Sequence, residues 1–189
     1  RALPVRAFER EFHAMTQAGT SSVLSGKLVT VLGVNGFIGT HLAQHLLARG
    51  ARLRIACRHP KRAFRIKPLG NLGQVQFAAC DVTDAQSLAR VLAGSDAVVN
   101  LVGAFTGDLD AVQGRGAGQI ARAAREAGAA RFVHVSAIGA DADSRIAYAR
   151  TKGEGEAAVR EAFLEATIVR PSLVFGPDDS LLAMFGGLI

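Results

Sequence analysis

The stretch from residue 27 to residue 50, KLVTVLGVNGFIGTHLAQHLLARG, decides the fold. It begins with a continuous apolar run, Lys27–Leu32, which is the pattern of a strand buried on both faces. A run with three glycines follows, and Phe37–Arg49 then repeats apolar side chains at helical spacing until Gly50 ends the helix. A glycine-rich turn between a buried strand and a helix is typical of the first βα unit of a dinucleotide-binding domain.

The same alternation of strands and helices continues along the rest of the chain. Thr83 and Gln86 have the spacing of a capping box that would open the helix beginning at Asp84. Buried strands that alternate with helices form parallel sheets with right-handed crossovers. The predicted fold class is therefore α/β, a doubly wound parallel sheet of the Rossmann type. Strands are expected over 53–56, 75–79, 97–102, 131–136 and 166–170, helices over 84–92, 113–127 and 148–163, and a short basic helix or loop from Pro60.

Composition excludes several other classes of protein. Hydrophobic residues make up 49% of the 189 residues, and no apolar run reaches the roughly 18 residues that cross a membrane, so we expect no membrane insertion. The net charge is +6, but it is not spread along a stripe interleaved with aromatic residues, so nucleic acid is not an expected partner. Cys57 and Cys80 lack metal or redox spacing, which indicates two buried thiols in a reducing compartment. The expected location is the cytoplasm, either free or at the periphery of the inner face of a membrane.

The glycine loop, Gly33-Val34-Asn35-Gly36-Phe37-Ile38-Gly39, is the predicted phosphate site. The first glycine allows a tight turn, the second lets a pyrophosphate approach the backbone, and the third lets the helix pack on the strand. Free amides at the start of the helix and the helix dipole then favour the phosphates. The cofactor-binding residues expected in this loop are Gly33, Asn35, Gly36, Phe37, Ile38 and Gly39.

The residues after the second strand bear on which dinucleotide is preferred. NAD-binding domains usually place an acidic residue there to hold the ribose 2′-hydroxyl, whereas this chain has Arg58 and Arg62 and no acid. A guanidinium can bind a 2′-phosphate bidentately. The sequence therefore favours NADP(H) over NAD(H), with Arg58 as the first candidate contact and Arg62 as the second. The alternative is an exposed basic loop that binds no ligand.

Two further strand ends would meet the cofactor, because ligands of such folds bind beyond the carboxyl ends of the strands. Asp81-Val82 follows the third strand, where a carboxylate can reach the adenine amino group. Asp81 could equally cap the next helix, and both readings stay open. Leu101, Val102 and Gly103 end the fourth strand, and Gly103 would allow the cofactor to lie against the backbone.

Tyr148 and Lys152 form a YxxxK motif at the start of the helix after the fifth strand. At this spacing the phenol and the ammonium share one helix face. A neighbouring ammonium lowers the pKa of a phenol, and the same lysine can bond the cofactor ribose. The candidate catalytic residues are therefore Tyr148 and Lys152, with Ser136 as a donor to a substrate carbonyl. The alternative is a surface Tyr–Lys pair without function.

These motifs together resemble the extended and atypical branches of the short-chain dehydrogenase/reductase superfamily. More closely, the run from Thr30 to Asp179 resembles the NAD(P)H-binding accessory subunit of respiratory complex I and its bacterial relatives. The resemblance implies a tightly held cofactor, a contact from Pro171, a smaller C-terminal lobe, and complex I or another protein as partner. The segments that carry it are the glycine loop, Asp81, 100–103, Ser136, Tyr148, Lys152 and 170–172, and more closely 69–75, 134–136 and 174–179.

One departure from the family pattern puts catalysis in doubt. Active members usually carry the catalytic Ser or Thr one or two places beyond Ser136, where this chain has Ala137 and Ile138. Loss of one such donor can cost about 10²–10³ in rate. We therefore expect a structural or redox-sensing cofactor. The alternatives are an active NAD(P)-dependent oxidoreductase or epimerase/dehydratase that uses Tyr148 and Lys152, and an NADP-sensing regulatory module.

The sequence divides into three expected parts, and its histidines are not expected to bind a metal. Residues 1–26 are expected to be an N-terminal arm or an added remnant, 27–180 the NAD(P)-binding Rossmann domain, and 181–189 the start of a truncated C-terminal lobe. His41 and His45 have a spacing that can bind zinc, but no Glu follows His41 and no metal site is expected. His134 is expected to be a packed or backbone-bonded core residue.

Overall fold

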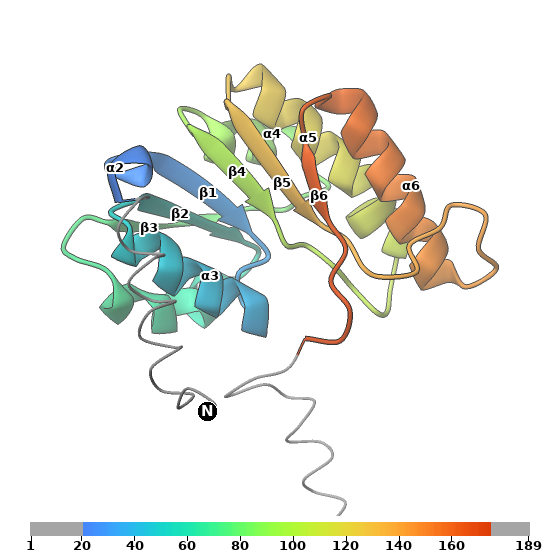
Figure 1. The fold of residues 1–189 in the computed structure, drawn as a ribbon, viewed down its shortest axis with the longest axis horizontal. Helices are drawn as coiled ribbons and strands as arrows, with labels where there is room; N and C mark the ends of the chain where they lie inside the picture. The colour runs from blue at the N-terminus through green and yellow to red at the C-terminus, as the bar shows by residue number, and fades with distance from the viewer. Residues whose placement is uncertain (1–20, 175–189) are drawn as a thin grey trace, which may run out of the picture.

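Six parallel strands form the sheet, in the order β3-β2-β1-β4-β5-β6 (Figure 1). The computed structural model describes residues 21–174. Strand order reverses between β1 and β4, which is the switch point where ligands of doubly wound sheets bind. The predicted fold class is confirmed. The strands are β1 (Leu28–Leu32), β2 (Arg52–Cys57), β3 (Val75–Ala79), β4 (Ala97–Asn100), β5 (Arg131–Val135) and β6 (Thr167–Val169).

Helices cover both faces of the sheet and bury two apolar clusters. On one face, side chains of α3 and η1 pack with those of β1 and β2, and Ala43, Leu47 and Ile66 are buried there. On the other face, α4, α5 and α6 enclose a second cluster around Phe132 and Ile120. The helices are α2 (Ser21–Leu24), α3 (Phe37–Ala48), the 3₁₀ helix η1 (Pro60–Leu69), α4 (Ala85–Leu92), the π-helix η2 (Asp110–Gly114), α5 (Arg115–Glu126) and α6 (Ala147–Ala162).

The predicted elements are present, with small differences in their bounds. The fourth strand ends at Asn100 rather than at residue 102, because Asn100 Oδ1 accepts a hydrogen bond from the Val102 amide and turns the chain out of the sheet. The predicted capping box is wrong. Asp84 caps α4 by accepting from the amide of Gln86, while the hydroxyl of Thr83 donates to Asp81 Oδ1 at 2.8 Å.

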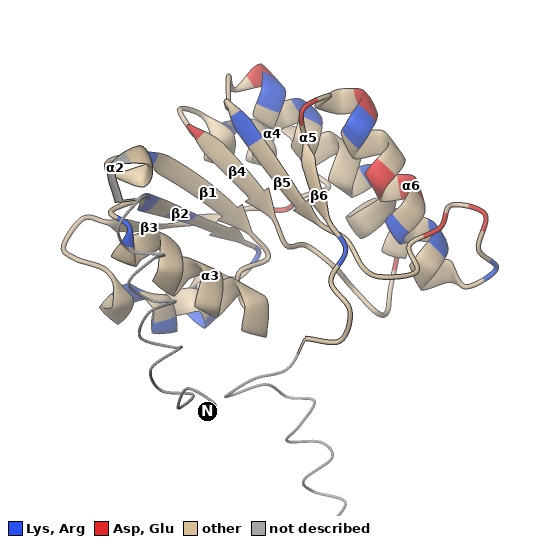
Figure 2. Ribbon diagram, viewed as in Figure 1, with Lys and Arg blue, Asp and Glu red and all other residues tan. Residues whose placement is uncertain are grey.

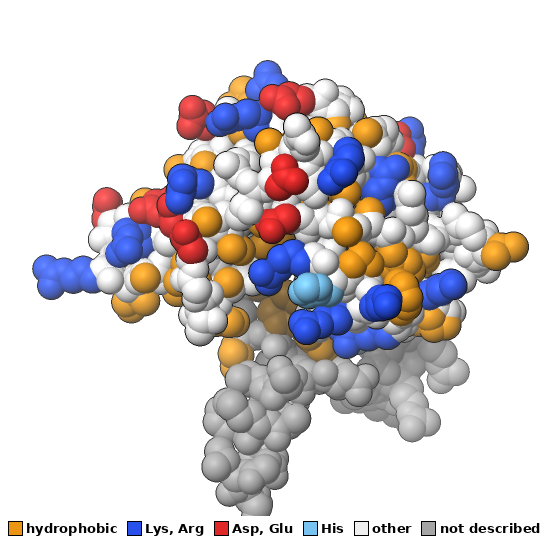
Figure 3. All heavy atoms as spheres, turned by 180° about the vertical axis from the view of Figure 1, so that it is seen from behind, with side chains coloured by type: hydrophobic (Ala, Val, Ile, Leu, Met, Phe, Trp, Pro, Cys, Tyr) orange, Lys and Arg blue, Asp and Glu red, His pale blue; other side chains and the backbone are white. Residues whose placement is uncertain are grey.

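Charge is unevenly distributed over the fold. Nine Lys and Arg residues and no acidic residue occur between residues 27 and 80, whereas the acidic residues of the later half lie on its loops and helices (Figure 2). Seen from behind, basic side chains gather over the half of the molecule that contains η1 (Figure 3). No helix within residues 21–174 is long and apolar enough to cross a membrane.

The two cysteines are free and buried, as predicted. Burial raises the pKa of both the Cys57 and the Cys80 thiol. A buried thiol with a raised pKa is a poor nucleophile, so both side chains serve packing in this fold.

Candidate functional site

The glycine loop between β1 and α3 lies against the end of β4. Gly33 has φ +78°, and a Cβ atom on it would be 2.7 Å from the carbonyl carbon of Leu101 and 2.8 Å from the amide of Val102. Any other residue would be strained in this backbone conformation and would also collide with the segment that follows β4. The loop therefore meets β4 at the switch point of the sheet, as the predicted phosphate site requires.

The second glycine of the loop faces open space. A Cβ atom on Gly36 would meet no atom within 4 Å, and no side chain caps α3 at this residue. The amides of the first turn of α3 are therefore available to an external acceptor such as a phosphate.

Gly39 is required for a different contact from the one expected. Its Cβ would overlap the backbone of Val34, so the helix packs on the loop itself rather than on the strand.

Arg58 and Asp81 lie at the carboxyl ends of neighbouring strands. The last residues of β2 and β3, Cys57 and Ala79, are paired, and both charged side chains are exposed just beyond them. The amide and hydroxyl of Thr83 lower the pKa of Asp81, and the charge of Arg58 contributes to the same effect. The structure thus brings these two predicted cofactor contacts to the same edge of the sheet.

A basic residue that sequence reasoning missed contacts the glycine loop directly. Arg65 Nη2 donates a hydrogen bond of 2.6 Å to the carbonyl of Asn35. Arg62, also exposed, lies three residues earlier in η1, and residues three apart are eclipsed in a 3₁₀ helix. That spacing is a signal that could have placed Arg62 and Arg65 on one face. The Asn35 side chain also bonds the thiol of Cys57, so two contacts hold the loop to β2 and η1.

Asn100 and His134 form a buried pair under the end of β4. Asn100 Oδ1 accepts from the Val102 amide, so its Nδ2 donates to His134 Nδ1 at 3.1 Å. The proton of the imidazole is then on Nε2, which has no partner. Burial, with a smaller effect from the charge of Lys152, lowers the pKa of His134 to about 4. His134 is a core residue as predicted, but its partner is a side chain and not the backbone.

A buried glutamine joins the loop after β4 to α6. Gln113 Oε1 accepts from the amide of Ala104 at 3.0 Å, and its Nε2 donates to Thr151 Oγ1 at 2.9 Å. In the same place, a Cβ atom on Gly103 would lie 3.4 Å from Lys152 Nζ. The loop after β4 and the lysine of the YxxxK motif are therefore neighbours. Sequence spacing gave no signal for Gln113, which lies in the π-helix η2.

Tyr148 and Lys152 lie one turn apart at the start of α6. The ring of Phe105 stacks on Tyr148 with centroids 5.1 Å apart, and Lys152 is only 4% exposed. Burial lowers the pKa of Lys152, and the nearby carboxylate of Glu156 partly offsets this effect. The expected lowering of the Tyr148 pKa is not found: burial raises it, while the Lys152 ammonium is directed to the carbonyl of Val135 at 3.4 Å.

Ser136 lies beside a buried carboxylate. Its Oγ is buried and makes no hydrogen bond of ordinary length, although it is close enough to help lower the pKa of Glu156. Glu156 is 1% exposed and accepts two hydrogen bonds of 2.7 Å from Arg170. Sequence reasoning did not select Glu156. Its place one turn after Lys152 was visible, but its burial was not.

Pro171, the last predicted cofactor contact, follows Arg170 directly. Its carbonyl accepts a hydrogen bond of 2.9 Å from the amide of Ile138. The ion pair between Arg170 and Glu156 therefore ties the segment after β6 to α6, and the Pro171 carbonyl ties it to the segment after β5. Pro171 and Lys152 are joined through these contacts rather than by sequence proximity.

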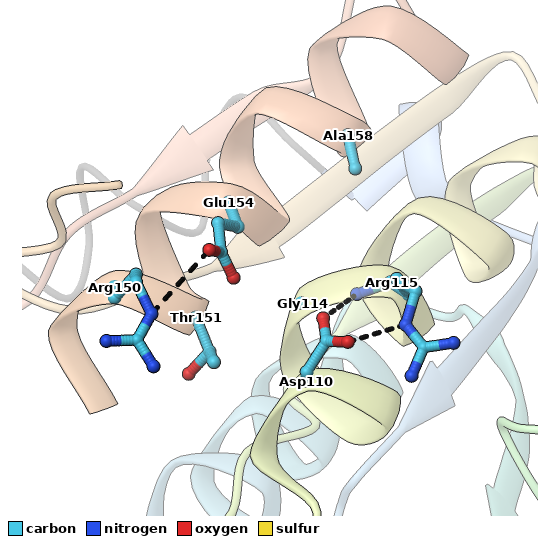
Figure 4. Close-up of a pocket in the computed structure, with 7 residues that line it drawn as sticks. All are labelled: Asp110, Gly114, Arg115, Arg150, Thr151, Glu154 and Ala158. Carbon is cyan, nitrogen blue, oxygen red and sulfur yellow. Dashed lines mark hydrogen bonds and ion pairs between the residues drawn. The ribbon is translucent and has the colours of Figure 1, made fainter. Parts of the chain in front are cut away.

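A separate pocket of about 470 Å³ opens between the start of α5 and α6 (Figure 4). Two exposed ion pairs, Asp110–Arg115 and Arg150–Glu154, line it. Exposed pairs of this kind contribute little to stability. None of the predicted cofactor contacts lines this pocket, so it is distinct from the site at the strand ends.

Known proteins resemble this chain in sequence and in fold. Subunit 9 of the NADH dehydrogenase [ubiquinone] 1 alpha subcomplex, mitochondrial, from Mus musculus is 36% identical over 174 residues, which cover 89% of this chain and 46% of that protein. Ceramide reductase from Caulobacter vibrioides is 33% identical over 157 residues, covering 81% and 48%. The chain spans about half the length of these curated relatives.

The structure of a short-chain type dehydrogenase/reductase from Mycobacterium ulcerans matches with a TM-score of 0.72 and 20% identity, covering 85% of this chain and 72% of that one. This likeness agrees with the Rossmann sheet described above. The model of the NAD(P)H-binding family matches residues 33–180, which begin at the first glycine of the loop. The chain therefore belongs to the NAD(P)H-binding family.

Proposed function

We propose that this protein retains NADP(H) as a structural or redox-sensing cofactor and binds a protein partner of the respiratory complex I type. The observation that carries the proposal is the geometry of the glycine loop. Gly33 is wedged against Leu101 and Val102, while Gly36 faces open space at the uncapped start of α3. A pyrophosphate fits this cradle, because it needs free amides and a backbone without side chains.

The other predicted contacts fit a dinucleotide that extends from this cradle in both directions. Asp81 and Arg58 would meet the adenosine half, and Lys152, Gly103 and Pro171 the ribose and nicotinamide half. When bound, the nicotinamide ring can accept or donate a hydride. The protein's own residues orient the two halves and shield the ribose from water.

The preference for NADP(H) over NAD(H) is assigned to Arg58. Its guanidinium is exposed at the end of β2, where a 2′-phosphate would arrive. Asp81, just beyond the neighbouring strand β3, opposes this preference, because a carboxylate repels a phosphate. A charge-assisted hydrogen bond is worth about 1.5–3 kcal/mol, which is roughly a 10–100-fold difference in affinity.

Titration of NADPH and NADH by fluorescence tests this assignment. We expect Arg58→Ala to weaken NADPH by roughly 10–100-fold and to leave NADH nearly unchanged. Lys67→Ala is the matched control, since it removes a charge from the exposed end of η1. Equal affinity of the wild type for both nucleotides would refute the preference. Equal loss in Arg58→Ala and Lys67→Ala would refute the role of Arg58.

The proposed partner rests on sequence similarity to a named subunit of a respiratory complex. In this proposal the protein lies in the cytoplasm at the periphery of the inner face of the membrane and attaches to that complex. Affinity-tagged protein, expressed in its own cell at natural levels, should co-purify with NADH:ubiquinone oxidoreductase activity. Recovery of the tagged protein free of that activity under mild detergent would refute this part.

An active reductase is the second candidate, favoured by the placement of Tyr148 and Lys152 on the first two turns of α6. The similarity to a protein named ceramide reductase supports the same candidate. The full-length protein would be assayed for NADPH oxidation with ketones, aldehydes and long-chain carbonyl compounds. Turnover in the ordinary range of about 1–10³ s⁻¹ that is lost in Tyr148→Phe would favour catalysis over cofactor retention.

A further inference from the structure

Five polar side chains gather between the ends of β5 and β6 and the start of α6. His134, Ser136, Lys152 and Glu156 are each at most 5% exposed, and Arg170 joins them from the end of β6. Two of their atoms, His134 Nε2 and Ser136 Oγ, are buried without a hydrogen-bond partner. Burying a polar group without a hydrogen-bond partner is costly, so these two atoms call for an explanation.

Glu156 is the member of this cluster that links Lys152 to Arg170. It lies one helical turn after Lys152, so the two side chains share a face of α6. Both of its oxygens accept hydrogen bonds of 2.7 Å from Arg170, and Arg160 lies 3.4 Å from the same carboxylate. Through Arg170 it fixes the segment that carries Pro171. One carboxylate therefore connects the helix of Lys152 with the segment of Pro171.

The polar groups around Lys152 come from α6, from β5, from the segment after β6 and from η2. Tyr148 and Glu156 lie on its own helix, and burial raises the pKa of the Tyr148 phenol. His134 of β5 is uncharged near neutral pH, since burial lowers its pKa to about 4. Arg170 reaches the group through Glu156. From η2 comes Gln113, which is neutral. Glu156 is the acidic group that acts on the ammonium and opposes the effect of burial.

We propose that Glu156 is a positioning residue for the ribose and nicotinamide half of the dinucleotide site, acting through the ammonium of Lys152 and through Arg170. The inference rests on the proposed function, because it takes Lys152 as a cofactor contact. Glu156 touches neither the cofactor nor any substrate. It keeps Lys152 charged in a buried place and holds the Pro171 segment against α6.

The test compares Glu156→Gln with Glu154→Gln. The control removes the same charge from the same helix at an exposed residue that pairs with Arg150. For each protein, NADPH and NADH are titrated over a series of pH values, and the high-pH midpoint at which binding weakens reports the charge of Lys152. Because the charge of Glu156 raises the pKa of Lys152, the midpoint should move to lower pH in Glu156→Gln. Above both midpoints, both nucleotides should bind more weakly than to wild type, by about tenfold for each pH unit of that shift. Glu154→Gln should match wild type.

Arg170→Gln is a second variant, and its binding midpoint should shift in the opposite direction. It removes a positive charge from the surroundings of Lys152 and leaves Glu156 ionised at alkaline pH, so the midpoint should rise. Arg170 is 48% exposed, so its loss is tolerated better than that of the buried Glu156. If Glu156→Gln does not fold, as judged by circular dichroism, the direction of the Arg170→Gln midpoint decides: a rise supports the proposal, and an unchanged or lower midpoint overturns it.

The remaining outcomes separate the inference from the proposed function. Absence of binding to wild type would refute the proposed function itself, and the inference would fall with it. Normal binding to wild type, with Glu156→Gln equal to Glu154→Gln, would overturn the inference alone. Weaker binding of both nucleotides to Glu156→Gln at every pH, with an unmoved midpoint, would also overturn it, since a merely structural role gives that result.

Discussion

His134 should make the stability of this protein depend on pH in a narrow range. Its imidazole is fully buried, accepts a hydrogen bond from Asn100 and stays uncharged, because burial lowers its pKa from 6.5 to about 4. In the unfolded chain the imidazole is hydrated and takes up a proton near its ordinary pKa. The folded state is therefore stabilised fully above about pH 6.5, and this stabilisation is lost as the pH falls toward 4.

The size of the effect follows from the two pKa values. Each unit of difference is worth about 1.4 kcal/mol, so the whole range between 6.5 and about 4 amounts to about 3 kcal/mol. Between about pH 7 and about pH 5 the expected loss is about 2 kcal/mol, a large part of the stability of an ordinary domain. Four carboxyl groups also have lowered pKa values, but they titrate below the range between about pH 7 and about pH 5. They belong to Asp81, Asp96, Asp110 and Glu156.

Urea unfolding at a series of pH values measures this loss. His134→Gln is the test variant, because its amide oxygen can still accept from Asn100 while the side chain cannot be protonated. Its unfolding free energy should change by well under about 1 kcal/mol between about pH 7 and about pH 5. His59→Gln, at an exposed position, should keep the wild-type slope. Equal slopes for wild type and His134→Gln would refute the reasoning.

Three further predictions concern the glycine loop. Gly33→Ala should lower the unfolding free energy by more than Gly128→Ala, by about 2 kcal/mol, since both glycines have φ +78° but only Gly33 abuts backbone; equal losses by urea titration would contradict this. Gly36→Val should leave unfolding free energy nearly unchanged yet abolish nucleotide binding, because its side chain would fill the open space of the cradle; normal binding measured by calorimetry would move the phosphate site elsewhere. Arg65→Gln should weaken NADPH and NADH by the same factor, because Arg65 holds the Asn35 carbonyl; a loss confined to NADPH would assign it to the 2′-phosphate instead.

Much of the fold could be predicted because its signals are local. The buried strand Leu28–Leu32, the glycine turn and the amphipathic spacing of α3 lie within one continuous stretch. In parallel sheets the position of a motif along the chain also gives its place in space, because every strand ends at the same edge. That rule placed Arg58 and Asp81 beyond the ends of two paired strands, and the residues after β4 beside the glycine loop.

The parts that sequence could not supply depend on contacts between distant segments. Arg65 meets Asn35 across 30 positions of the chain, and Gln113 meets Thr151 across 38. The burial of Glu156 depends on how α6 packs against the end of β6, which no helical pattern specifies. The lowered pKa expected for Tyr148 failed for the same reason, since helical spacing alone does not determine where the ammonium of Lys152 points.

The central claim is that the protein retains NADP(H), and the nucleotide released from the purified protein tests it most directly. The protein would be purified without added nucleotide, saturated with a mixture of NADPH and NADH, freed of excess by gel filtration and denatured by heat. Chromatography of the supernatant should then recover about one NADPH per chain, with little NADH. Recovery of neither nucleotide, or of NADH in preference, would contradict the account.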